Sequence, residues 1–430
     1  MVRRVPITWF DLTGHQFGTD DTLIAPESVG ILFGDAGGSL LDRSTGGKDT
    51  LTIHGSGNFY GDAVGNIADR ARGGDDTLTA QVTGAGPATI GLYGDAGANI
   101  SDRGRGGNDT LVAGPSPVPV TISMYGDAGQ NLSGRAAGGD DAFHLSAFQN
   151  TFTIYGDAGR NMSGHAVGGN DTAVDGSGEG FVTFYGDAGG SISGHGRGGD
   201  DSLNTGLEDS VTFFGDAGGN LGNHASGGDD IMNVASSGPV IAYGDATSMS
   251  DRASGGDDTL IVRAQLFANS MIVGDAQTMS QHAHGGDDVL DVDAIRHLQG
   301  TITLIGDAQT MSGRAQGGND RLIGGNGNDD MWGDAQIMLD RARGGDDTFV
   351  FDLGNGRDRI GDFGQGVCGA GPDWGTDHID VSALGITDFG QLVISAFDPT
   401  THESTISFGS GNEVVVHSQQ ALGAQDFLFA

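Results

Sequence analysis

The chain of 430 residues contains only one cysteine, Cys368, so it cannot form an internal disulfide framework. It has no run of about 18 apolar residues, which excludes a transmembrane helix. Residues 1–17 include two arginines but no apolar core of a secretory signal peptide, so we expect any export to use a different signal. An extracellular protein of this size without disulfides needs another stabilising element, and bound metal can provide one.

Cations are scarce as well. The sequence has 20 Lys and Arg against 57 Asp and Glu, which gives a net charge of −37. Such a chain repels nucleic acid and anionic membranes and attracts divalent cations. There is no H-E-x-x-H, no G-x-S-x-G and no Walker-type phosphate loop, and the glycine pairs lack the βαβ context of a dinucleotide site. We therefore predict a protein that is not an enzyme and has no nucleic-acid partner.

Glycine, in contrast, is abundant, with 81 residues and no Gly-X-Y period that would indicate collagen. Many of these glycines belong to two motifs that alternate along the chain, GDA and GG(D/N/K)D. Eleven such pairs recur at intervals of 27 to 33 residues, and the two motifs of a pair begin 12 residues apart in the first seven copies and 11 apart in the last four. A separation this constant indicates that both motifs belong to one structural unit.

Each unit contains two short segments in which apolar and polar residues alternate, as they do in a half-buried β-strand. One precedes GDA, as in residues 89–93, and the other follows GG(D/N/K)D, as in residues 77–79. A unit of about 30 residues cannot bury its own apolar face, so only stacking supplies a core. The sequence thus predicts an all-β fold, a parallel β-solenoid that is β-roll-like, with about eleven coils, inserted loops and a β-rich C-terminal capping domain.

The segment between the two motifs shows a different spacing. An apolar residue is followed four positions later by alanine, as in Leu132 and Ala136 or Met162 and Ala166. The alanine of GDA precedes that apolar residue by four positions in early copies and by three in late ones. Both spacings keep one helical face. We therefore expect a single helical turn or a tightly packed loop here.

The second Asp of GG(D/N/K)D is present in all eleven copies, whereas the first position varies among Asp, Asn and Lys. Turn formation alone would accept Asn or Ser as readily, and a charged oxygen ligand suits Ca²⁺. In the first copy, Lys48 lies beside Asp49, so we expect a weak or empty site there. The other second-position residues are predicted calcium ligands: Asp76, Asp109, Asp141, Asp171, Asp201, Asp230, Asp258, Asp288, Asp320 and Asp347.

The Asp of GDA is also present in every copy. It could bind metal from the neighbouring turn, or it could cap backbone N–H groups of the insertion. The sequence leaves both interpretations open. The first copy contributes Asp35, and the candidate ligands in the other copies are Asp62, Asp95, Asp127, Asp157, Asp187, Asp216, Asp245, Asp275, Asp307 and Asp334.

One stretch, residues 324–332, fits the complete pattern G-G-x-G-x-D-x-U-x, where U is a large apolar residue. Gly324, Gly325 and Gly327 would turn backbone carbonyls inward, and Asp329 would supply a carboxylate. This nonapeptide resembles the calcium-binding repeat of RTX (hemolysin-type) proteins, which stack as a parallel β-roll. The resemblance is strong over residues 317–430 and extends through half-motifs over residues 34–316. It implies that several calcium ions are the cofactor.

Residues 348–430 lack the repeat and are more aromatic. The segments 358–363, 377–384, 405–409 and 426–429 resemble the C-terminal region of secreted RTX proteins, including serralysin-type proteases and alginate epimerase repeat modules. That resemblance implies a cap on the β-roll with an uncleaved signal for type I secretion. The type I apparatus is then an expected partner, and the location is extracellular or at the cell surface. We divide the chain into an N-terminal cap (1–33), a calcium-binding repeat solenoid (34–347) and this C-terminal region (348–430).

Twelve histidines raise the question of a zinc site. His165, His195, His224 and His282 occupy related positions in the insertion, but arginines such as Arg70 occupy that position or the next in other copies. This exchange disfavours zinc and indicates an exposed polar position.

Together these patterns predict a secreted calcium-binding repeat protein whose solenoid folds on binding Ca²⁺ and has a structural or interaction role outside the cell. An alternative is a cell-surface adhesin or matrix module that binds polysaccharide, which aromatic residues clustered on one face would favour. A more remote alternative is a secreted enzyme that uses the variable loops.

Overall fold

The computed structural model describes residues 10–25, 28–84, 86–146, 150–175, 180–263, 269–292, 301–352, 354, 356–366, 372–409 and 411–430. Cys368 lies outside these residues. The chain divides into two compact units, residues 1–228 (unit 1) and 229–430 (unit 2). Both are built of parallel β-strands in stacked coils, about eleven turns in total. The predicted all-β class and parallel β-solenoid are therefore confirmed.

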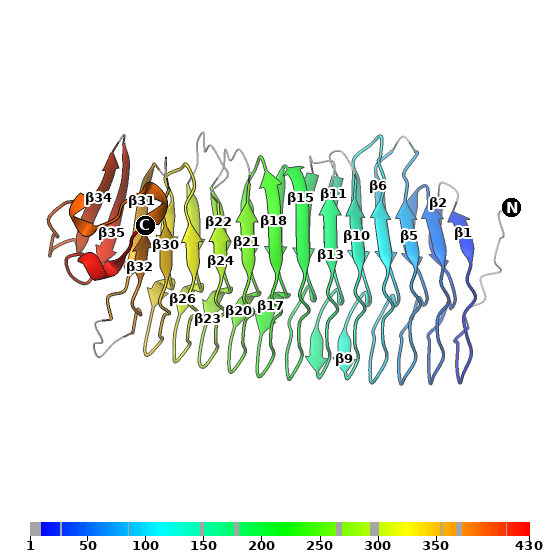
Figure 1. Cartoon of the computed structure of the whole chain (residues 1–430). Helices are drawn as coiled ribbons and strands as arrows, with labels where there is room; N and C mark the ends of the chain where they lie inside the picture. Colours follow the sequence, from blue (N-terminus) through cyan, green and yellow to red (C-terminus); the bar gives the residue numbers. More distant parts are fainter. Residues whose placement is uncertain are drawn as a thin grey trace. The chain divides into compact units, whose positions relative to one another are not determined.

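In unit 1, each coil contributes one strand to each of two parallel sheets, and Figure 1 shows these strands side by side in chain order. The first sheet consists of β1 (Thr22–Ala25), β3 (Thr50–Ile53), β5 (Thr77–Ala80), β7 (Thr110–Ala113), β10 (Ala142–Leu145), β13 (Thr172–Asp175) and β15 (Ser202–Glu208). The second sheet consists of β2 (Ser28–Phe33), β4 (Ser56–Tyr60), β6 (Ala88–Tyr93), β8 (Val120–Tyr125), β11 (Asn150–Tyr155), β14 (Gly180–Tyr185) and β16 (Ser210–Phe214).

Alternate side chains of these strands are buried, as the period of two predicts. In the first sheet, Leu51, Leu78 and Leu111 are fully buried and pair with one another in register from coil to coil. Residues 10–25 and 28–33 already belong to the stack, because Leu12 pairs in parallel with Leu40, β1 with β3 and β2 with β4. Stacking thus gives every coil the core that it could not form alone.

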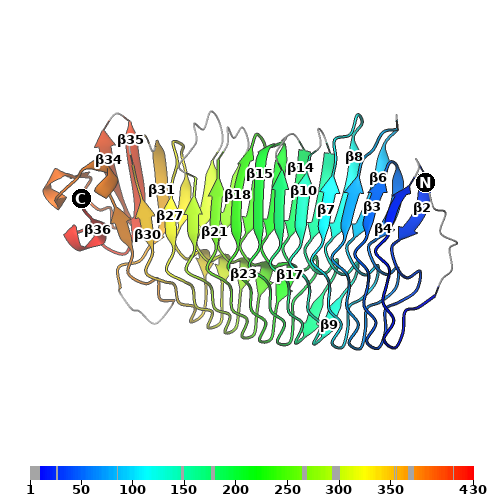
Figure 2. The same ribbon diagram turned by 45° about the vertical axis from the view of Figure 1, so that its right-hand side comes forward.

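A column of aromatic rings shows the spacing of the coils directly. The rings at positions 60, 93, 125, 155 and 185 are all tyrosines, and neighbouring centroids lie 4.5–5.1 Å apart. This is the distance between adjacent β-strands. Each position of the repeat therefore forms a column along the unit, with one residue per coil, as the side-by-side strands in Figure 2 illustrate.

The inserted segment between GDA and GG contains no helix; it is a packed loop that includes a short strand in some coils, which agrees with the second of the two expectations and not with the helical turn. It forms the short strands β9 (Leu132–Gly134), β12 (Met162–Gly164) and β17 (Ala217–Leu221) in unit 1. Its backbone bonds to neighbouring coils, as from the N–H of Met162 to the carbonyl of Ser191, and also closes one turn within itself, as from the N–H of Ala136 to the carbonyl of Ser133. Both ends of β17 are buried, and a separation of four residues keeps one face of a strand as well as one face of a helix.

Unit 2 repeats this arrangement. Its first sheet contains β18 (Ile231–Ser236), β21 (Thr259–Val262), β24 (Val289–Asp291), β27 (Arg321–Ile323), β30 (Thr348–Val350), β32 (His378–Asp380) and β36 (Phe427–Leu428). Its second sheet contains β19 (Val240–Tyr243), β22 (Ser270–Val273), β25 (Ile302–Ile305), β28 (Asp330–Trp332), β31 (Arg357–Phe363), β35 (Asn412–Ser418), β34 (Glu403–Gly409) and β33 (Val393–Ile394). The inserted segments form β20 (Ala246–Met249), β23 (Ala276–Met279), β26 (Ala308–Met311) and β29 (Ala335–Met338).

The C-terminal part of unit 2 covers the last coils. Strand β35 continues the parallel ladder from β31, and β34 then pairs with β35 in the antiparallel direction. Three short 3₁₀ helices complete this part: η1 (Ser382–Leu384), η2 (Phe389–Gln391) and η3 (Ala424–Asp426). Within the described part of the chain, no helix is long and apolar enough to cross a membrane.

Candidate metal centre

One column of buried aspartates consists of the second Asp of each GG(D/N/K)D motif, directly before a strand of the first sheet. We call it the strand column. Its members are at most 2% exposed. In unit 1, the backbone N–H of Asp76 donates to Oδ1 of Asp109 at 2.6 Å, and Asp109 donates in the same way to Asp141. In unit 2, Asp288 donates to Asp320 at 2.8 Å. One carboxylate oxygen therefore holds the preceding coil in register.

The other oxygen of these carboxylates is not used in this way. In eight members of the strand column, Oδ2 is buried and has no hydrogen-bond partner among the described residues: Asp49, Asp76, Asp109, Asp141, Asp171, Asp288, Asp320 and Asp347. Buried polar atoms in native proteins are nearly always paired. The repeat therefore presents, coil after coil, a buried oxygen with unused bonding capacity.

A second column consists of the Asp of each GDA motif, which we call the turn column. Asp62 accepts the N–H of Gly74 at 2.8 Å, and Asp275 accepts the N–H of Gly286 at 2.9 Å. Each of these glycines is the second of the GG pair, at the far end of the inserted segment. The carboxylate thus joins the two ends of that segment. This is the backbone-capping role that the sequence left open, whereas metal binding by the same residues stays a prediction.

Glycines allow a close approach where the two columns meet. A Cβ atom on Gly61, the first residue of a GDA, would collide with Oδ2 of Asp76 and with the carbonyl oxygen of Gly94 in the next coil. A Cβ atom on Gly73, the first of a GG pair, would collide with the turn-column carboxylate of Asp95. The absent side chains therefore let carboxylate and carbonyl oxygens lie directly against the glycine backbone, and this arrangement recurs in successive coils.

Burial raises the pKa of the column carboxyls, and neighbouring carboxylates add to the effect. The pKa of Asp62 is raised by burial and then by the charges of Asp76 and Asp95. Burial is also the main cause that raises the pKa of Asp49 to about 8 and that of Asp157 to about 6. Ionised carboxylates packed in this way need a compensating positive charge, which either a bound proton or a metal cation can supply.

The donor set is suited to a hard cation. The columns offer oxygen atoms, which Ca²⁺ prefers, and Ca²⁺ accepts backbone carbonyls as well as carboxylates. Among the described residues, no group of three or more His, Cys, Asp or Glu side chains lies close enough to hold one metal ion. A bound ion would therefore have to combine carboxylates with backbone carbonyls, such as that of Gly94. The residues fit Ca²⁺ under that condition.

The complete nonapeptide lies at another corner of the coil, in the connection between β27 and β28. The N–H of Asp329 donates to Oδ1 of Asp358 at 2.9 Å, and its Oδ2 accepts the N–H of Gly325 at 3.2 Å. Oδ1 of Asp329 is buried and has no hydrogen-bond partner among the described residues. Burial is the main cause that raises the pKa of Asp329 to about 7. The nonapeptide therefore repeats the geometry of the strand column at a separate place, with Asp358 as its partner.

Three further aspartates extend these sites and were missed in the sequence. Asp358 continues the nonapeptide site, and Asp377 accepts the N–H of Asp347 at 3.0 Å as the next member of the strand column. Asp362 accepts three N–H groups from residues 333–335. Burial is the main cause that raises the pKa of Asp358 to about 8 and that of Asp362 to about 7. No glycine pair marks them, but an aspartate two positions before a strand isoleucine could have revealed Asp358 and Asp377.

The histidines form an exposed column of their own. The rings of His165 and His195 stack with centroids 5.0 Å apart, and those of His195 and His224 lie 5.1 Å apart. The rings of the first pair are nearly parallel, with an interplanar angle of 7°. In the first copy, the exposed Lys48 donates its backbone N–H to Asp20.

Comparison of the chain with protein-family models, with curated proteins and with solved structures found no match. The functional argument therefore depends on the repeat residues and on the geometry of the columns.

Proposed function

We propose that this chain is a secreted calcium-binding repeat protein whose solenoid folds when Ca²⁺ binds, with a structural or interaction role outside the cell. The observation that supports this most directly is the unpaired, buried Oδ2 atom that recurs along the strand column. A buried carboxylate is costly unless it is paired. Extracellular calcium modules bind at roughly 10⁻⁴–10⁻³ M, so calcium outside the cell would supply the missing charge.

Circular dichroism and direct calcium binding test this proposal together. The chain is purified, freed of metal with a chelator and titrated with Ca²⁺ at neutral pH, while the β signal and the bound calcium are both measured. We expect the β signal to increase with bound calcium and Mg²⁺ to substitute poorly, because Mg²⁺ keeps its waters and demands a strict octahedral geometry. A folded chain that binds no calcium would refute the proposal.

Secretion through a type I apparatus is proposed from the resemblance of residues 348–430. Deletion of residues 389–430 should leave the chain inside the cell. Because this deletion also removes β35, which pairs with β31, the deleted chain could be retained through misfolding alone. A second experiment therefore fuses residues 348–430 to an unrelated passenger. Export of the passenger only in cells that have the apparatus would support the proposal, and its retention in those cells would contradict it.

Polysaccharide binding through aromatic faces receives little support from the tyrosine column. The aromatic residues do gather in one column, from Tyr60 to Tyr185, with Phe214 following at 5.2 Å. Neighbouring rings stack on one another, so the faces that a sugar would contact are covered inside the column. The edges of these rings also lie against glycines such as Gly97 and Gly129 of the next coil. The column is thus explained by packing between coils.

A further inference from the structure

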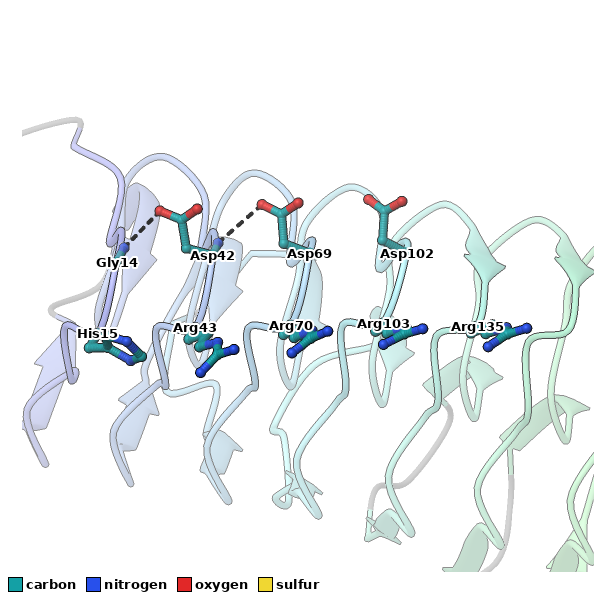
Figure 3. Close-up of a pocket in the computed structure, with 9 residues that line it drawn as sticks. All are labelled: Gly14, His15, Asp42, Arg43, Asp69, Arg70, Asp102, Arg103 and Arg135. Atoms are coloured by element: carbon teal, nitrogen blue, oxygen red, sulfur yellow. Dashed lines mark hydrogen bonds between the residues drawn. The ribbon is translucent and has the colours of Figure 1, made fainter.

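A cationic column runs along the outside of unit 1, in a chain that has only 20 Lys and Arg. We call it the arginine column; its members are Arg43, Arg70, Arg103 and Arg135. Each lies nine residues after the first glycine of its GDA motif, and all four are exposed. Figure 3 shows the four side chains in one row, extended in the same direction. Four successive coils therefore present one guanidinium each, at the spacing of the coils.

The backbone holds this column in register. In three coils the preceding residue has a left-handed conformation, with φ of 64° at Asp42, 62° at Asp69 and 61° at Asp102. The N–H of Arg70 donates to the carbonyl of Asp42 at 2.9 Å, and the N–H of Arg103 donates to that of Asp69 at 2.9 Å. The turn thus directs each arginine outward while hydrogen bonds between coils set its position.

The neighbouring aspartates do not neutralise the arginines. Oδ2 of Asp42 accepts the N–H of Gly14 at 2.8 Å, and Oδ2 of Asp69 accepts the N–H of Asp42 at 3.1 Å. Figure 3 shows these carboxylates in a second row, away from the guanidinium groups. Within the described part of the chain, the ion pairs involve Arg321, Arg357 and Arg359, and none involves the arginine column.

Both rows line one open groove with a volume of about 770 Å³, bounded at one end by Gly14 and His15. Among the described residues no ion pair involves these arginines, so no contact within the fold explains why this position is cationic in four successive coils. An anionic ligand that follows the groove would pair with them.

We infer that this groove binds a linear acidic polysaccharide. Guanidinium groups bind carboxylates and sulfates through paired N–H donors, and a polymer with repeated anionic groups can contact several coils at once. The parallel row of aspartate oxygens provides acceptors for sugar hydroxyl groups. Single-stranded nucleic acid fits less well, because none of the described residues that line the groove is a Phe, Tyr or Trp on which bases could stack. Sulfated and carboxylated polysaccharides share this chemistry, and the binding experiment below distinguishes them.

This inference specifies a partner for the proposed interaction role and does not require calcium to bind in the columns. The test uses the full chain with three substitutions, Arg70→Gln, Arg103→Gln and Arg135→Gln. The matched control carries Arg160→Gln, Arg197→Gln and Arg263→Gln, which change the net charge equally at other exposed positions. Circular dichroism in excess calcium first establishes that all three proteins have the same β signal.

Binding is measured on immobilised hyaluronan, which carries carboxylates, on dextran sulfate, on uncharged dextran and on oligothymidylate. We expect wild-type chain and control to bind at least one acidic polysaccharide and not dextran. The column variant should bind about tenfold or more weakly, as loss of three charge-assisted contacts implies. The preferred polymer identifies the anionic group.

Equal binding by the column variant and the wild-type chain would overturn the inference, and so would an equal loss in the control. Tighter binding to oligothymidylate than to both acidic polymers would assign the groove to nucleic acid instead. If the folded chain binds neither acidic polymer, the groove proposal fails while calcium-dependent folding is unaffected. If the chain folds without calcium, the calcium proposal fails and the binding assay still decides the groove.

Discussion

The backbone N–H of Asp109 donates a hydrogen bond of 2.6 Å to Oδ1 of Asp141 in the next coil, while Oδ2 of Asp141 is buried and has no hydrogen-bond partner among the described residues. The two oxygens of one carboxyl group thus have different roles. One aligns adjacent coils, and the other is available to a proton or a cation.

We predict that the calcium-free chain loses its β structure at alkaline pH. Two carboxylates at the coil spacing of ~4.8 Å repel by about 3 kcal/mol at an effective dielectric constant of 20. Two aspartate columns contain many such neighbours, and a typical domain is stable by only ~5–15 kcal/mol. The measurement is circular dichroism in excess chelator at low ionic strength. A full β signal that calcium does not change would contradict this prediction.

The stability of the calcium-free chain should decrease as pH rises. The pKa of Asp157 is raised from 3.8 to about 6 and that of Asp49 to about 8, mainly by burial. Since these groups titrate near their ordinary values when unfolded, the folded chain binds more protons between roughly pH 4 and pH 8. The free energy of unfolding is then highest near pH 4 and falls until about pH 8.

Calcium binding should show the complementary pH dependence. Calcium and protons compete for the same carboxylates, so the apparent calcium affinity increases with pH and binding releases protons. Calcium titrations at about pH 6 and pH 8 measure the change in affinity. Melting curves of the calcium-free chain at the same two pH values measure the change in stability. A calcium-free chain that is more stable at the higher pH would exclude this explanation.

The substitution Asp141→Asn should have opposite effects with and without calcium. It removes one buried negative charge, so the calcium-free chain becomes more stable at alkaline pH, while the calcium-dependent gain in stability becomes smaller. The control is Asp140→Asn, at the adjacent exposed position that is already Asn in Asn108 and Asn170. We expect the control to change either stability by less than about 0.5 kcal/mol. Equal effects of the two substitutions would rule out a special role for the strand column.

The substitution Gly107→Ala should destabilise the solenoid. A Cβ atom at this position would collide with the carbonyl oxygen of Gly74 in the preceding coil. Forcing the coils apart should cost about 1–3 kcal/mol, as for other overpacked sites. Gly84→Ala is the control, because its Cβ would meet no atom within 4 Å. Denaturant unfolding in excess calcium compares them, and similar midpoints for both variants would show that the close approach is not required.

The substitution Asp329→Ala should act locally. In a stacked array each coil contacts only its neighbours, so loss of the nonapeptide carboxylate should loosen β28 and β31 and leave unit 1 unchanged. Hydrogen exchange measured by segment tests this in the presence of calcium. Faster exchange throughout unit 1 would show that the coils do not respond independently.

Most of the fold could be predicted from the sequence because the same strand and turn patterns recur in every repeat. The alternation in segments such as residues 121–125 and the constant spacing of GDA and GG define strands and turns that have to stack. The spacing in the inserted segment left a helical turn open because Ala217 and Leu221, four residues apart, share one face in a strand as well as in a helix. The hydrogen bonds from coil to coil distinguish the two conformations.

The sequence singled out the aspartates that the structure places in buried columns, but not their arrangement, and metal binding by them stays a prediction. The sequence places Asp329 in the same pattern as the strand column, yet the structure pairs it with Asp358 at another corner of the coil. Asp358, Asp362 and Asp377 lie beyond the glycine-marked repeats, so the only signal for Asp358 and Asp377 is an aspartate two positions before a strand isoleucine, and Asp362 has none. The free oxygen of each carboxyl group depends on which N–H groups lie nearby, and that requires the three-dimensional structure.

The contact between coils is the same whatever the length of chain that separates them. Asp76 bonds to Asp109, 33 residues on, at 2.6 Å, and Asp141 bonds to Asp171, 30 residues on, at 2.7 Å. Differences in length are absorbed in the outer connections, and the interface stays unchanged. One coil can therefore be duplicated or lost during evolution without redesign of its neighbours. The length of such an array then changes in steps of ~4.8 Å, one step for each coil that is gained or lost.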